Sequence, residues 1–229
     1  MRVRLRAWGV CAAAAVVATA LTGCGAVGDA NDAMRSSSFH SSGGTTAFAG
    51  GWQEMWWNPD QGLRVKATWV GGSGEMYCKD GTTYTGAALL ARALGEKGER
   101  VTVPDRLAGT YVTSELPDGA DCDTYFRIPD QAERASERDR TLHGRGTEAF
   151  TVEAAADASD TASGTSSDTS SDTYYVESDT SRLVLLESTR NGRHSTTTYD
   201  SFGGEFTITL PAAERTMPLE EFRSQVTGG

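Results

Sequence analysis

The 229-residue chain has little lysine, histidine and isoleucine: three lysines, three histidines and two isoleucines. Its formal net charge is -10, with 31 acidic against 21 basic residues. Proteins that bind nucleic acid need clustered Lys and Arg to neutralise phosphates, so this charge argues against that class. Beyond the N-terminus no run of about 20 apolar residues occurs, which excludes a protein with several membrane-spanning helices. The length suits one sizeable domain rather than two.

Signatures of catalysis are also missing. The chain contains no G-x-S-x-G, S-x-x-K or H-E-x-x-H motif, and its three histidines stand far apart. A nucleophile would need a base and an orienting group beside it. Asp118, Asp121 and Asp123 could suggest calcium, but without the twelve-residue loop of a calcium site a solvated turn is favoured. The sequence therefore predicts a protein that is not an enzyme and holds no cofactor or metal.

Residues 1–24 have the three parts of a secretion signal. Three arginines within the first six residues precede an apolar stretch from Trp8 to Ala20. The tetrapeptide Leu21-Thr22-Gly23-Cys24 then resembles a bacterial lipobox. This resemblance implies cleavage before Cys24 and transfer of diacylglycerol to its sulfur, and two acyl chains anchor a protein stably. The alternative is an ordinary secretory signal that is cleaved elsewhere.

An anchor at Cys24 predicts a lipoprotein on the extracytoplasmic face of the cell membrane. Removing the signal, residues 1–23, takes away three arginines and no acid, so the mature chain is more negative. The excess of Arg over Lys, with abundant Ala and Gly, resembles the bias of a high-GC actinobacterium. We expect residues 24–35 to be the lipidated cysteine and a flexible tether. On such a tether, a negative domain of residues 36–229 should stand off an anionic membrane.

The cysteine count fits an oxidising compartment. Cys11 leaves with the signal and Cys24 is lipidated, so Cys78 and Cys122 remain. Such a pair in an exported protein is most simply a disulfide. The competing interpretation, two metal thiolates, lacks nearby partners, because no histidine has ligand-like spacing to either cysteine.

Short β-like runs separated by turns fill most of the domain. Leu63, Val65, Ala67 and Trp69 alternate with polar residues, as in a half-buried strand. One helix is predicted over 87–94 and another after Pro218. The tract at about 157–172 has no hydrophobic side chain larger than Ala and predicts a disordered loop. A weaker strand is expected at Thr124–Ile128, and a further strand at Glu205–Leu210, where Phe206, Ile208 and Leu210 share one face. The fold class is α+β, mainly β.

Three segments of the second half read GTEAFTVEA from Gly146, DTYYVESDTSRLVLLESTR from Asp172 and HSTTTYDSFGGEFTITLPAAE from His194. They resemble the C-terminal half of LolA/LppX-like periplasmic and lipoprotein carriers. The last one carries the family-like phrases Tyr199–Gly203 and Thr209–Pro211. The resemblance covers about a third of the chain. It implies a curved antiparallel half-barrel with helices packed on its concave side, and a lipid or lipid-linked ligand between them.

Four tryptophans form the candidate binding surface: Trp52, Trp56, Trp57 and Trp69. On strand spacing Trp52 and Trp56 share one face and Trp57 takes the other. They could make an aromatic wall for a ligand or a patch for a partner, or they could be ordinary core, which is favoured. A cavity that binds lipid requires an aliphatic lining. The later strands are instead rich in Thr, Ser and Glu.

The function expected from the sequence is therefore a non-enzymatic module that binds or carries a lipid or amphiphile and is held at the membrane by diacylglyceryl-Cys24. The alternative is an envelope interaction or sensory lipoprotein that uses the same fold without lipid cargo and binds an envelope protein.

Overall fold

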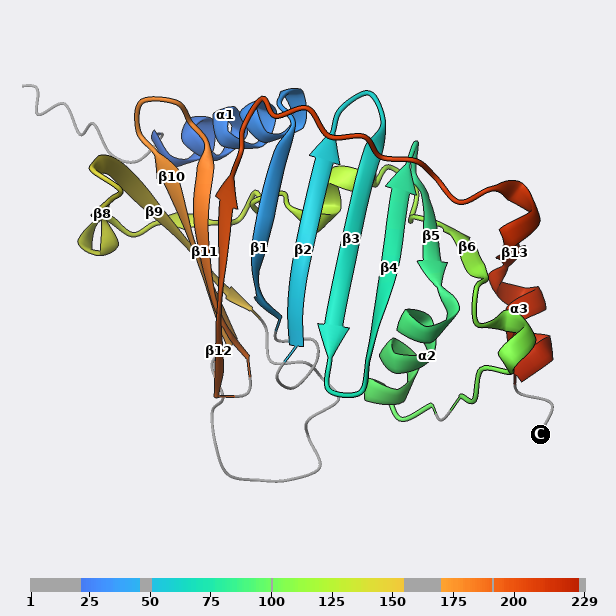
Figure 1. Ribbon diagram of the computed structural model, residues 1–229. Helices are drawn as coiled ribbons and strands as arrows, with labels where there is room; N and C mark the ends of the chain where they lie inside the picture. The colour runs from blue at the N-terminus through green and yellow to red at the C-terminus, as the bar shows by residue number, and fades with distance from the viewer. Residues whose placement is uncertain (1–21, 46–50, 100, 155–169, 191, 227–229) are drawn as a thin grey trace, which may run out of the picture.

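The computed structural model describes residues 22–45, 51–99, 101–154, 170–190 and 192–226 (Figure 1). Thirteen strands in these ranges join one curved, open sheet, accompanied by three α-helices. The order along the sheet is β13-β6-β5-β4-β3-β2-β1-β12-β11-β10-β9-β7, and β8 also pairs with β9. Neighbours are antiparallel except β13 and β6, which are parallel. The predicted fold class, mainly β with a curved antiparallel sheet, is confirmed.

The elements fall into two halves. The first contains α1 (Thr22–Ser36), β1 (Phe39–Thr45), β2 (Gly51–Asn58), β3 (Gly62–Trp69), β4 (Gly72–Lys79), β5 (Thr82–Gly86), α2 (Ala87–Glu96), η1 (Asp105–Leu107) and β6 (Tyr111–Glu115). The second contains η2 (Cys122–Tyr125), β7 (Glu133–Arg134), η3 (Ser136–Arg138), β8 (Arg140–Leu142), β9 (Arg145–Ala154), β10 (Ser170–Glu177), β11 (Leu183–Arg190), β12 (Arg193–Asp200), η4 (Ala213–Arg215), β13 (Thr216–Pro218) and α3 (Leu219–Val226).

The two halves join where β1 pairs with β12, and again where β13 pairs with β6. Position 43 is opposite Thr197 in the β1–β12 pair, and a Cβ on Gly43 would lie 2.1 Å from the Thr196 carbonyl oxygen. Only glycine allows the two backbones to approach this closely. The joint connects residues about 160 positions apart into one continuous sheet.

The sheet has an inner face, which packs on the core, and an outer face. Along β3 the inner positions Leu63, Val65 and Ala67 are 0%, 8% and 4% exposed, while Arg64 and Lys66 point to the outer face and are half-buried. This is the alternation that the sequence predicted. A Cβ added at Gly62, which has φ +97°, would lie 2.3 Å from the Cys78 carbonyl oxygen, so the β2–β3 turn requires glycine.

Helix α1 covers part of the inner face, and this overturns the expected tether at residues 24–35. Its Val27, Ala30 and Met34 are buried in the main core beside Phe39 and Trp57. These three positions share one helix face, since residues three and four apart in a helix are neighbours. The segment folds because its few apolar residues find a core built by strands from both halves, although its glycines and polar residues favour helix poorly.

The Cys78–Cys122 disulfide holds η2 and the residues after it against the inner face. The bridge is formed, with the two Cα atoms 5.6 Å apart, so the predicted pairing is confirmed. Cys122 begins η2, and the following Phe126 packs edge-on against Phe39 at 5.0 Å between ring centroids and against Trp57 at 5.1 Å. The segment that was expected to be a strand at Thr124–Ile128 is therefore a 3-10 turn followed by an inward-facing loop.

Two further expectations need correction. Residues 205–210 are extended but join no strand ladder; their backbone is instead held by the side chains of Asn58 and Gln61. Of the loop expected at about 157–172, residues 157–169 lie outside the described ranges, while Ser170–Asp172 belong to β10, paired with β9 and β11.

Candidate interaction surface

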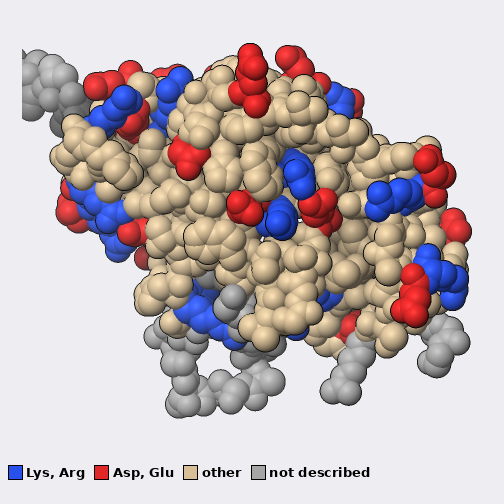
Figure 2. All heavy atoms as spheres, viewed as in Figure 1, with Lys and Arg blue, Asp and Glu red and all other residues tan. Residues whose placement is uncertain are grey.

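A continuous row of polar and aromatic side chains crosses the outer face. We call the residues Asp200, His40, Trp56, Arg64, Glu75 and Tyr77 the outer row. They come from five neighbouring strands, β12, β1, β2, β3 and β4, and the cross-strand pairing places them side by side. Figure 2 shows charges of both signs gathered over the middle of this region. The row exists because the outer-facing positions of these strands fall in register.

Contacts run through the row without a break at its centre. His40 Nδ1 lies 3.0 Å from Asp200 Oδ1, and the His40 ring lies 5.3 Å from the Trp56 ring between centroids. On the other side of Trp56, the Arg64 guanidinium lies 5.1 Å from the ring centroid, within cation–π range. The indole is thereby held between an imidazole and a guanidinium.

Glu75 accepts hydrogen bonds from two other members of the outer row. Arg64 donates a hydrogen bond to Glu75 Oε1 at 2.5 Å, and the Tyr77 hydroxyl donates to Oε2 at 2.8 Å. Tyr111 on β6 lies at the far side, with its ring 5.7 Å from that of Tyr77. The Arg64 Nε is buried and has no partner. The arrangement fixes both charged groups while leaving part of each side chain open to solvent.

These contacts change the acidity of two groups. Burial raises the pKa of Tyr77 to about 12, and the hydrogen bond to Glu75 adds to the effect. Burial also works to raise the pKa of Glu75, but the hydrogen bonds from Arg64 and Tyr77 outweigh it, so that this pKa lies below its usual value. At neutral pH the row therefore holds an ionised carboxylate beside a neutral phenol.

Alkaline titration of tyrosinate absorbance tests this. The wild type minus Tyr77→Phe difference is expected to rise with a midpoint near pH 12 instead of near pH 10. Because folding raises this pKa, the contribution of Tyr77 to stability is complete below about pH 10 and is lost as the pH rises through about 12. Circular dichroism at each pH would verify that the fold persists, and a midpoint near 10 in folded protein would contradict the geometry.

The four predicted tryptophans do not form one surface. Trp52, 51% exposed, and Trp56 lie on the outer face, as strand spacing predicted. Trp57 is buried on the inner face and donates a hydrogen bond from Nε1 to the Arg35 carbonyl. Trp69 packs partly against Ala67 and Leu89. A role in binding stays a prediction for Trp52 and Trp56, while Trp57 is a core residue.

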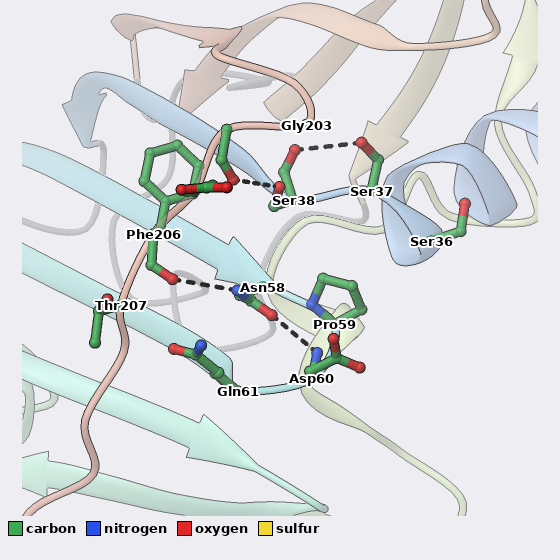
Figure 3. A pocket seen from close by; sticks show the side chains of 12 residues that line it. Ser36, Ser37, Ser38, Asn58, Pro59, Asp60, Gln61, Gly203, Phe206 and Thr207 are labelled. Carbon is green, nitrogen blue, oxygen red and sulfur yellow. Dashed lines mark hydrogen bonds between the residues drawn. The ribbon is translucent and has the colours of Figure 1, made fainter.

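A polar groove of about 560 Å³ lies at the ends of the central strands β1, β2 and β3 (Figure 3). It is bounded by the end of α1, the β2–β3 turn and the extended segment after β12. Ser38 Oγ donates to the Gly204 carbonyl and Asn58 Nδ2 donates to the Phe206 carbonyl, so hydrogen bonds connect the segments that line the groove. The lining is mostly polar, and it lacks the apolar surface that would bury an acyl chain.

His194, Asp121 and Asp123 have local partners. His194 Nδ1 lies 2.9 Å from Thr189 Oγ1, and His143 occupies a turn with φ +51°. Asp121 accepts a hydrogen bond from the Cys122 amide, and Asp123 pairs with Arg35. Over the described ranges, no three His, Cys, Asp or Glu side chains gather where they could hold a metal ion. None of the helices in those ranges is both long enough and apolar enough to cross a bilayer.

The alternation predicted along residues 63–69 puts polar side chains opposite the core, but it does not reveal the outer row. Its members lie as far apart in the chain as His40 and Asp200, and only the β1–β12 pairing brings them together. The sequence shows which residues of each strand are polar and alternate with apolar ones, but it does not show the order of the strands in the sheet.

Comparison with known proteins finds similarity at the level of structure. No family model matches the chain, and no curated protein matches it either. Among solved structures, LprF from Mycobacterium bovis is 14% identical and covers 83% of this chain and 97% of its own, with a TM-score of 0.45. LppX from Mycobacterium tuberculosis is 11% identical, covers 81% and 97%, and has a TM-score of 0.45. A LolA superfamily protein from Nitrosomonas europaea is 9% identical, covers 84% and 96%, and has a TM-score of 0.32. At 9–14% identity, the likeness to these structures is one of fold alone.

Proposed function

We propose that the chain is an extracytoplasmic lipoprotein, anchored through diacylglyceryl-Cys24, whose domain binds an envelope protein through the outer row. The observation that carries this proposal is the row itself. Trp56 and Arg64, stacked on each other and partly exposed, stand on a rigid sheet. Trp, Tyr and Arg dominate the energetics of protein interfaces, and a sheet holds them in place at little entropic cost.

Carriage of a lipid or amphiphile, which the resemblance implies, is the competing function. Against it, Ala30 and Met34 of α1 are fully buried against the inner face, where a ligand between helix and sheet would lie. The groove beside α1 is lined mainly by polar groups. Where α1 packs, the inner face is therefore occupied by the chain's own side chains.

Native mass spectrometry of the membrane-extracted protein tests both parts of the proposal. The measured mass is expected to be that of a mature chain that begins at acylated Cys24 and has a protein partner bound. Trp56→Ala is expected to weaken that complex by about 30-fold or more, since interface anchors of this kind contribute about 2 kcal/mol or more. Trp57→Phe, a conservative change on the inner face, should keep the partner.

Three results would each overturn part of the proposal. A chain that repeatedly carries a non-covalent lipid and no protein would establish carriage instead. A mature protein without acyl chains at Cys24 would remove the anchor. A partner that binds Trp56→Ala as well as wild type would move the interface away from the outer row.

A further inference from the structure

The geometry points to a domain that is seated directly on the lipid headgroups, with the first turns of α1 at the bilayer surface and no flexible spacer between anchor and fold. This inference rests on the proposed lipidation of Cys24. The interaction surface is the N-terminal end of α1, and its partner is the leaflet that holds the acyl chains.

Helix α1 extends back through Cys24, because its bounds are Thr22–Ser36. Val27, 3% exposed, is the first buried residue after the anchor. The two positions are three steps apart in the helix, and at 1.5 Å per residue this is about 4.5 Å along the axis. A flexible tether of a dozen residues would instead have an end-to-end distance of about 20 Å.

Several contacts hold α1 on the domain. Asn31 donates from Nδ2 to the Ile128 carbonyl at 2.9 Å and accepts from the Ile128 amide at 2.8 Å. Trp57 donates to the Arg35 carbonyl at 3.2 Å, and Arg35 pairs with Asp123. Releasing the helix would expose Met34 and break these bonds, so α1 cannot serve as a tether while the domain is folded.

The seating sets which end of the sheet faces the membrane. The last turn of α1 lies beside Trp57, which pairs with Leu63 at the start of β3. Figure 1 shows α1 along the end of the sheet where β3 begins. Val70, 87% exposed, follows the other end of this eight-residue strand, about 23 Å away along it. The β3–β4 turn is therefore expected to point away from the bilayer.

The test uses the full acylated protein in vesicles of phosphatidylcholine and phosphatidylglycerol that contain a headgroup-nitroxide lipid. Fluorophores are attached to Gly28→Cys, an exposed position where a Cβ meets nothing within 4 Å, and, as the matched control, to Val70→Cys. We expect quenching at position 28 to be at least two-fold stronger than at position 70. A ten-residue Gly/Ser spacer inserted between Cys24 and Gly25 should abolish the difference.

The outcomes separate the two proposals. Equal quenching at both positions in acylated protein, or a spacer without effect, would overturn the seating and leave the anchor intact. If the protein has a mass without acyl chains and does not partition into the vesicles, the anchor and the seating are both overturned.

Discussion

Removing the Cys78–Cys122 bridge is expected to lower the free energy of unfolding by about 4 kcal/mol. The two cysteines are 44 residues apart, so the bridge closes a long loop of the unfolded chain. The bond also holds η2 and Phe126 over Phe39 and Trp57. Urea unfolding of the Cys78→Ala/Cys122→Ala double variant, monitored by tryptophan fluorescence, measures this loss.

Reductant provides the control. Wild type that has been unfolded with reductant and refolded is expected to have the same free energy of unfolding as the double variant. Reductant should not change the free energy of unfolding of the variant itself. Since Cys78 and Cys122 are 0% and 1% exposed, reduction is expected to require unfolding. A loss below about 1 kcal/mol would mean that the loop is already restricted in the unfolded chain.

Replacing Asn31 by Leu is expected to cost about 3 kcal/mol. The change keeps the approximate shape of the side chain but leaves the amide and carbonyl of Ile128, which is 0% exposed, without their partners. Each buried polar group left unsatisfied costs about 1–3 kcal/mol. The free energy of unfolding in urea is again the measurement.

Asp32→Ala is the matched control on the next residue of α1. Asp32 is 69% exposed and pairs with Arg35, and an exposed ion pair contributes about 0–1 kcal/mol. If Asn31→Leu were as mild as Asp32→Ala, α1 would not be part of the cooperative unit, and the seating of the domain on the bilayer would lose its structural basis.

Local patterns predicted much of the fold. Alternation in β3 separated core from surface, and the helix expected over 87–94 is α2. The disulfide was predicted by counting, because the expected lipoprotein signal accounts for the other two cysteines. Each of these features depends on neighbours in the chain or on composition.

Helix α1 was missed although its signal was present. Val27, Ala30 and Met34 have helical spacing, but three apolar residues among glycines and polar residues do not form a stable helix alone. The core that supports them includes Phe150 and Tyr199, more than a hundred positions away. A local pattern could not supply that partner.

The sequence by itself determined a β-rich domain, its disulfide and the alternation of its strands, because these depend on short spacings and on residue chemistry. Only the tertiary structure decided that α1 is part of the domain and that His40, Trp56 and Arg64 form one row. Those features depend on strand order and register between distant segments, and a shift of one residue in register would turn every side chain to the opposite face.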